Sequence, residues 1–195
     1  MNEKYELTGE FKEIETLREG WLQKIKVYRI RALRAFADVK IGDLGGFVET
    51  KQNLSNMGNA WVYGNAEVYG NAKVCNNARV YDNAWVCGNA KVYGNAKVYG
   101  NAEVCGDAKV CDNANIFWCS SIGSRHATTT MFRNKDNGIT VTCGCFMGTL
   151  EEFAERVEKE HGENIFGKEY KLLIELAKIH FGLQDETKGE EENGI

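Results

Sequence analysis

Small and β-branched residues recur at a fixed period of six between Asn59 and Phe117, separated by polar positions. The six-residue phrase Asn-Ala-x-Val-Tyr/Cys-Gly is repeated ten times there without an insertion. The alanine and the β-branched residue are two positions apart, so both point to the same side of a short strand. One unit has too little apolar surface to fold alone. The pattern therefore predicts coils that stack on their own copies.

The inward positions of the repeat are constant and the outward ones vary. Alanine stands at positions 60, 66, 72, 78, 84, 90, 96, 102, 108 and 114, and a β-branched residue follows two places later, from Val62 to Ile116. The residue between them changes freely from unit to unit, as expected of an outward-facing side chain. Gly, Asn or Asp closes each unit up to position 112, and these residues tolerate the left-handed backbone of a corner. Short strands joined by such corners indicate a parallel β-helix.

This spacing resembles the hexapeptide repeat of left-handed parallel β-helix proteins, in which three units make one triangular coil. The preceding segment, residues 30–62, carries the phrases IRAL, DVK, GDLGG, NLS and GNAWV. It closely resembles the entry segment of YdcK-like hexapeptide-repeat proteins of bacteria and phages, so the likeness extends over residues 28–117. The resemblance implies a mainly β fold, with a left-handed β-helix over residues 45–118, and a homotrimer, the usual assembly of this class.

Residues that are three units apart are expected to stack about 4.8 Å from each other on three outer faces. The first face carries Lys73, Lys91 and Lys109 beside Cys75, Tyr93 and Cys111, the second carries Tyr63, Tyr81, Tyr99 and Phe117 beside Trp61, Arg79, Lys97 and Asn115, and the third carries Glu67, Trp85 and Glu103. We expect the aromatic column of the second face to be the subunit interface. The lysine column is either a solvated face or a strip that binds an acidic partner or ligand.

The flanking segments are not periodic at six. Residues 5–7 and 21–30 predict two strands, and the resulting hairpin is expected to plug the open first coil within an N-terminal capping segment, residues 1–44. After the repeat, residues 131–133 and 139–146 predict a hairpin. Thr149 and Glu152 form a capping box that starts a helix ending near His161.

A second helix is predicted over residues 168–181, and the hairpin and the two helices make a C-terminal α+β cap and ligand module, residues 119–183. The acidic tail, residues 184–195, predicts disorder.

The most suggestive run outside the repeat is Gly-Ser-Arg-His-Ala-Thr-Thr-Thr, residues 123–130. A guanidinium, short hydroxyls and backbone amides at a glycine-containing bend are suited to a phosphate or carboxylate. The candidate ligand-binding residues are Ser124, Arg125, His126, Thr128, Thr129 and Thr130, joined by Lys73, Lys91 and Lys109 of neighbouring coils. The alternative is that the three threonines form an ordinary strand and that Arg125 makes a surface ion pair. The run is also similar to a C-terminal module of phage and prophage β-helix proteins.

Two other classes of function stay open. Hexapeptide-repeat acyltransferases use a histidine as general base, and His126 is the one near the coils, whereas His161 and His180 stand at predicted helix ends. That class also needs a loop extending from the coils to bind its cofactor, and the ten units contain none. A structural or adaptor protein would instead use the aromatic and lysine columns to dock a protein partner.

Composition narrows the range of partners. The net charge of −4 argues against general nucleic-acid binding, and no apolar run approaches the length of a membrane span. The N-terminus lacks the form of a signal peptide, so we expect a cytoplasmic protein, in the host cytoplasm if it is encoded by a phage. Four of the seven cysteines replace Tyr in the repeat, which indicates apolar fillers in a reducing compartment. Cys143 and Cys145 supply two ligands, whereas a tetrahedral zinc site needs four. No metal or cofactor is therefore expected.

The sequence thus favours a non-catalytic, cytoplasmic, trimeric binding protein for a small anionic, nucleotide-like ligand. The phage resemblance adds the hypothesis that the ligand is an immune signalling nucleotide that the protein sequesters.

Overall fold

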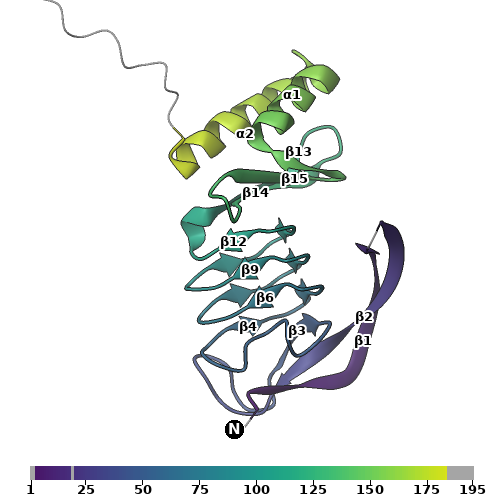
Figure 1. Ribbon diagram of the computed structural model, residues 1–195, viewed down its shortest axis with the longest axis vertical. Helices are drawn as coiled ribbons and strands as arrows, with labels where there is room; N and C mark the ends of the chain where they lie inside the picture. The colour runs from purple at the N-terminus through teal and green to yellow at the C-terminus, as the bar shows by residue number, and fades with distance from the viewer. Residues whose placement is uncertain (1–2, 19, 184–195) are drawn as a thin grey trace, which may run out of the picture.

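The computed structural model of the chain describes residues 3–18 and 20–183. The fold is mainly β and contains a β-solenoid of about four turns, which confirms the predicted class. A long hairpin lies beside the N-terminal end of the solenoid, and a small sheet with two helices covers the C-terminal end (Figure 1). The predicted disordered tail, residues 184–195, lies outside the described residues.

The solenoid is built from strands of two residues each, which fall on three parallel sheets. The sheets contain β4 (Trp61–Val62), β7 (Arg79–Val80) and β10 (Lys97–Val98); β5 (Glu67–Val68), β8 (Trp85–Val86) and β11 (Glu103–Val104); and β6 (Lys73–Val74), β9 (Lys91–Val92) and β12 (Lys109–Val110). Residues eighteen apart pair directly, as in Trp61 with Arg79 and Lys73 with Lys91. The predicted coil length is therefore confirmed.

The interior of the solenoid follows from the two constant positions of the repeat. The alanines from Ala60 to Ala108 and the valines from Val62 to Val110 are at most 1 % exposed and belong to one continuous core. Each corner has one residue with φ between 57° and 70°, and at two corners this residue is Asn76 or Asp82 instead of glycine. The sequence-based assignment of inside and corner positions is correct for these coils.

The N-terminal hairpin is longer than predicted, and its base covers the first coil. Its strands β1 (Tyr5–Arg18) and β2 (Trp21–Ala32) pair along their whole length, with a bulge that breaks the alternation between Leu7 and Phe11. β2 pairs with β3 (Leu44–Val48), so the hairpin extends one solenoid sheet sideways. Its base enters the solenoid core through Tyr5, Ile30 and Ala32, and the rest curves along the outside of the coils (Figure 1).

Two side chains at outward positions of the repeat are buried, contrary to the expectation that this position is exposed. Trp61 is 1 % exposed because the rings of Tyr5 and Phe36 pack edge-on against it at centroid distances of 6.1 and 5.3 Å. Glu67 is covered by the hairpin, where Lys12 pairs with its carboxylate at 3.1 Å. Segments far away in the sequence therefore cover the first coils.

The tenth repeat unit leaves the solenoid. A 3-10 turn over Asn113–Asn115 leads into β13 (Ile116–Ile122), which pairs antiparallel with β14 (Ala127–Arg133). β15 (Ile139–Cys143) and β16 (Phe146–Thr149) complete a four-stranded sheet. As a result the aromatic column ends with Trp118 against Tyr99, at 4.4 Å, and not with the predicted Phe117, whose ring instead faces His180.

Two helices cover the outer side of this sheet. α1 (Leu150–His161) starts at the predicted capping box of Thr149 and Glu152. α2 (Ile165–Phe181) starts three residues earlier than predicted, because the side chain of Asn164 accepts a hydrogen bond from the Gly167 amide. Neither helix is long and apolar enough to cross a membrane, nor is any other helix of the described residues.

Side chains satisfy the backbone groups that a coil exposes at each end of the solenoid. At the first coil the carbonyl of Ala60 has no preceding coil to accept from, and the buried Lys4 ammonium donates to it at 2.9 Å. At the last coil the Glu103 amide donates to the Thr130 hydroxyl at 3.1 Å. At each end, one backbone group that a further coil would pair with is thus satisfied by a side chain.

Candidate functional site

A cavity of about 180 Å³ lies in the C-terminal module, between the β13–β14 turn, the β15–β16 turn and one side of the two helices. Its walls combine cationic, hydroxyl, thiol and apolar groups. The lining residues are Ser124, Arg125, Ala127, Cys143, Gly144, Cys145, Phe146, Phe153, Arg156, Val157, Glu160, His161 and Tyr170. Two of the residues predicted to bind the ligand, Ser124 and Arg125, are among them.

Residues of α2 hold in place the turn that carries Ser124 and Arg125. Gly123 has a φ of +70°, and its amide donates to the carboxylate of Glu169 at 3.0 Å. A Cβ atom at this position would lie 1.9 Å from the Tyr170 hydroxyl oxygen, so only glycine lets the turn and α2 approach each other. The turn closes with a hydrogen bond from the His126 amide to the Gly123 carbonyl at 3.0 Å.

Arg125 supplies a cation that no carboxylate of the described residues neutralises. Its guanidinium lies near Gly144 in the β15–β16 turn, where a Cβ atom would be 3.8 Å from one of its nitrogens. Among the residues that the structure describes, none forms an ion pair with Arg125. A planar guanidinium at the mouth of a small cavity is suited to a carboxylate or a phosphate, which it binds with two parallel hydrogen bonds.

Two further basic side chains reach the cavity from α1. Arg156 pairs with Glu160 one turn later, at 2.8 Å, so its charge is partly neutralised. His161 lies at the end of the helix, with its ring centroid 5.7 Å from that of Tyr170. Phe153 and Val157 of the same helix are buried and give the cavity an apolar wall. The lining of the cavity therefore combines basic side chains with apolar ones.

Tyr170 contributes a hydroxyl that stays protonated. Burial, followed by the neighbouring Cys143, raises its pKa above the ordinary range, while the charge of Arg125 acts weakly in the opposite sense. The hydroxyl lies 3.7 Å from the Cys143 sulfur, which also accepts a hydrogen bond from Thr129 at 3.2 Å. At neutral pH Tyr170 is thus a neutral hydrogen-bond donor, as an anion requires.

The other predicted ligand residues lie elsewhere. His126 is exposed in the turn with a φ of +48°, and Thr128 bonds to Ser120 on the surface. Thr129 and Thr130 are buried in β14. Lys73, Lys91 and Lys109 form the predicted column on the exposed face of β6, β9 and β12, and none of them lines the cavity.

Sequence reasoning missed Arg156, His161 and Tyr170 as members of the site. Arg156 stands next to the apolar positions Phe153 and Val157 of α1. The helical spacing therefore could have placed Arg156 at the border of the buried face. His161 was attributed to the helix end. Tyr170 lies on the buried face of α2, and nothing in the sequence indicates that its hydroxyl reaches the turn at Gly123.

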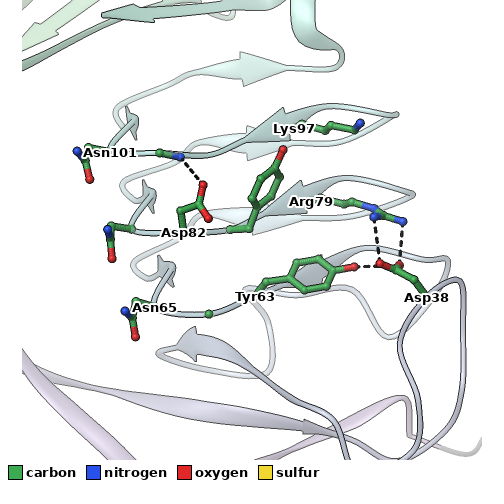
Figure 2. Close-up of a pocket in the computed structure, with 11 residues that line it drawn as sticks. Asp38, Tyr63, Asn65, Arg79, Asp82, Lys97 and Asn101 are labelled. Carbon is green, nitrogen blue, oxygen red and sulfur yellow. Dashed lines mark hydrogen bonds and ion pairs between the residues drawn. The ribbon is translucent and has the colours of Figure 1, made fainter. Parts of the chain in front are cut away.

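A second, larger hollow crosses the aromatic face of the solenoid. It is an open groove of about 880 Å³, and Figure 2 shows the side chains that line it. Asp38, from the loop before β3, reaches over the groove, where it bonds to Arg79 at 2.9 Å and accepts from the Tyr63 hydroxyl at 3.1 Å. Burial and the neighbouring Asp38 raise the pKa of Tyr63 to about 12, although Arg79 opposes this shift. The predicted trimer interface would cover this face and stays a prediction.

Electrostatics favour the cavity over the groove as the anion site. In the groove the charge of Arg79 is already matched by Asp38, and Asp82 adds a second carboxylate that accepts from the Gly100 amide. Lys97 is the cation of the groove for which no ion pair is formed within the described residues. The groove is therefore close to neutral, whereas the cavity has an unpaired guanidinium in a partly enclosed space.

The thiols and carboxylates of the described residues do not gather into a metal site. Within residues 3–18 and 20–183, no group of three or more His, Cys, Asp or Glu side chains is arranged to hold a metal ion. All seven cysteines are free, and Cys87 and Cys105 stack in neighbouring coils, where a hydrogen bond from the Cys105 thiol lowers the pKa of Cys87.

Comparison with known proteins adds one finding. No curated protein matches the chain at a significant level. Residues 72–88 match the family model described as the YdcK beta solenoid repeat. This segment runs from β6 to β8 and spans nearly one coil, so the match and the observed architecture describe the same repeat. Within the β-solenoid, residues 72–88 are therefore similar to the YdcK beta solenoid repeat.

Proposed function

We propose that the protein is a non-catalytic binding protein for a small anion, which is held in the cavity between the β13–β14 turn and the helices α1 and α2. The observation that carries the proposal is the unpaired guanidinium of Arg125 beside Ser124, Arg156, His161 and the protonated Tyr170. These groups supply positive charge and hydrogen-bond donors on one side of a partly apolar cavity. A carboxylate or phosphate group satisfies both features.

The size of the cavity restricts the ligand. Its volume of about 180 Å³ is smaller than the about 300–1,000 Å³ of drug-sized ligand sites. A phosphate ion or a short-chain carboxylic acid is of the right size. A nucleotide would insert only its phosphate, and its base and ribose would lie outside, across the exposed turn. Sequestration of a signalling nucleotide in the cytoplasm is the form of this function that the phage resemblance suggests.

The test is titration calorimetry of the full chain with inorganic phosphate, acetate, butyrate and AMP at fixed ionic strength. We expect Arg125→Ala to weaken binding about 10- to 100-fold, because charge-assisted hydrogen bonds contribute about 1.5–3 kcal/mol each. Arg125→Lys should recover part of the affinity, since it keeps the charge and loses the planar fork. Lys40→Ala is the matched control, because this exposed cation lies in the loop at the opposite end of the solenoid.

The outcomes separate the three classes of function. Unchanged affinity in Arg125→Ala would rule out the cavity as the site. Recovery of the ligand unmodified supports binding without turnover, whereas acyl-CoA turnover that disappears in His126→Ala would establish the transferase. Equal weakening in Lys109→Ala would bring the lysine column into the site. If none of the anions binds, the adaptor function becomes the better explanation.

A further inference from the structure

The solvent-facing side of α2 is apolar, although the helix beside it has a charged outer side. Four large side chains of α2 are between 51 and 77 % exposed, and they form the α2 stripe: Ile165, Leu172, Leu176 and Ile179. The neighbouring helix α1 presents glutamate, lysine and arginine to solvent instead. Both helices face solvent at this end of the molecule, but only α2 exposes a row of large apolar side chains. The α2 stripe therefore needs a separate explanation.

The α2 stripe is not needed to fold the chain. A separate set of α2 residues, among them Leu173, Ile174 and Phe181, is buried against the sheet and α1. A helix with two apolar faces usually packs on both of them. Exposed apolar surface of this kind on a folded protein marks a contact with another molecule.

The segment that follows α2 in the chain is not suited to cover the α2 stripe. Residues 184–195 contain five acidic residues and one large apolar residue, Ile195, at the far end. A polar segment of this composition would leave most of the apolar surface in contact with water. The occupant must instead present apolar side chains of its own.

Three of the four residues of the α2 stripe are spaced symmetrically about Leu172, whereas the position that mirrors Leu176 is Lys168. Ile165 and Ile179 stand seven residues before and after Leu172, so all three lie on one line of the helix surface. If two copies of α2 cross antiparallel with the two-fold axis at Leu172, the two Leu172 side chains meet. Ile165 of each copy then meets Ile179 of the other. A surface that is its own complement in this way fits an isologous dimer.

Charges beside the α2 stripe agree with the same register. Lys168 and Glu175 lie on the same flank of the stripe, four residues before and three residues after the axis. In an antiparallel pair related by a two-fold axis, the flank that carries Lys168 and Glu175 lies on the same side of the interface in both copies. Lys168 of one copy therefore lies opposite Glu175 of the other. Within the described residues Lys168 has no ion-pair partner. Two such pairs across the axis would favour this orientation over the parallel one.

We propose that α2 is a homodimerisation surface, on which the α2 stripe of a second copy packs antiparallel with its axis at Leu172. The proposal does not depend on the anion site, because Tyr170 and the cavity lie on the other side of α2. One helix face is smaller than the about 800 Å² per partner of a standard interface, so we expect a dissociation constant in the micromolar range, about 1–100 µM.

Sedimentation equilibrium of the full chain tests the proposal. We expect Leu172→Glu to raise the dissociation constant about 100-fold or more, because it brings two carboxylates together at the axis in place of two buried leucines. Leu22→Glu is the matched control, since Leu22 is 65 % exposed on the hairpin tip, away from α2. Circular dichroism melts show whether each variant is folded.

A charge exchange tests the orientation. Lys168→Glu and Glu175→Lys should each weaken association about 3- to 10-fold by placing like charges opposite each other, and the double variant should restore it. Both positions are exposed, so the fold should tolerate the changes. Weakening in the single variants without recovery in the double one contradicts the antiparallel register.

The remaining outcomes overturn the proposal. A monomer at all concentrations up to about 1 mM leaves no specific self-association to explain. An oligomer whose mass is unchanged in Leu172→Glu but falls in Tyr81→Ala assembles through the solenoid face instead. If Leu172→Glu halves the mass of an assembly larger than a dimer, α2 pairs units that are themselves oligomers, which supports the proposal.

Discussion

A single lysine closes the first coil of the solenoid, at the cost of burying a charge. Lys4 is fully buried and donates to the Ala60 carbonyl, and its ammonium lies 5.0 Å from the Phe36 ring centroid. Burial, assisted by the charge of Arg34, lowers the pKa of Lys4 from 10.5 to about 8. The Ala60 carbonyl, which no preceding coil can pair with, thus accepts a hydrogen bond from Lys4. Burial makes the charged form of Lys4 less favourable than it is in water.

The titration of Lys4 predicts how stability depends on pH. Between pH 8 and pH 10 the unfolded chain holds the Lys4 proton more tightly than the folded one, so the contribution of Lys4 to the free energy of unfolding should rise with pH. Lys4→Met should lack this rise. Denaturant melts of both proteins at pH 7, 8, 9 and 10 measure the difference between them, which should grow in favour of the wild type. A difference that is constant with pH would contradict the lowered pKa. The window ends near pH 10, where Tyr5, whose pKa is raised by burial, works in the opposite direction.

At the scale of one element, the corner of each coil decides how closely the next coil approaches. Gly64 and Gly94 stand at the same position of the six-residue repeat, at different corners of the coil, and have φ values of 57° and 64°. A Cβ atom at Gly64 would have no neighbour closer than 3.7 Å, whereas at Gly94 it would lie 2.3 Å from the Cys111 carbonyl oxygen. The same backbone conformation therefore has different steric surroundings in different coils.

This difference separates backbone strain from steric contact. Gly64→Ala should cost about 1–2 kcal/mol, the cost of left-handed backbone for alanine. Gly94→Ala should cost about 1–3 kcal/mol more, because the next coil must move. Urea denaturation of the two variants beside the wild type measures both values. Equal losses would show that the coils adjust freely. Asn76 and Asp82 take the left-handed conformation at their own corners and show that it is accessible to side chains that bond locally.

At the scale of the whole molecule, distant segments decide which repeat positions are covered. Trp61 and Trp85 occupy the same position of the repeat, yet Trp61 is buried under Tyr5 and Phe36 while Trp85 is 44 % exposed. The hairpin and the loop before β3 therefore make the first coil a different environment from the third, although the local sequence is alike.

The two tryptophans form a matched pair for measuring this coverage. Trp61→Ala should destabilise the protein by about 3–5 kcal/mol, as expected of a large buried side chain. Trp85→Ala should change stability by about 1 kcal/mol or less. Thermal melts followed by far-UV circular dichroism give both values. A small loss in Trp61→Ala would mean that the N-terminal segment does not pack on the first coil in solution.

The sequence by itself determined the solenoid. Alanine and valine at fixed positions and left-handed residues at the corners place each strand, because most inner side chains pack within their own coil and against the coils next to it. The capping box of α1 and the turn at residues 134–138 are local in the same sense and were also predicted correctly. Ser124 and Arg125 were identified as candidate ligand residues from one short run.

Only the tertiary structure decided what lies next to that run. Arg156, His161 and Tyr170 come from helices 26 to 47 residues away in the sequence, and their place around Arg125 depends on how α1 and α2 pack on the sheet. The same holds for the burial of Trp61 and for the ring that ends the aromatic column. A repeat fixes the contacts between neighbouring coils, whereas its ends and its attached modules are set by contacts between segments that share no pattern.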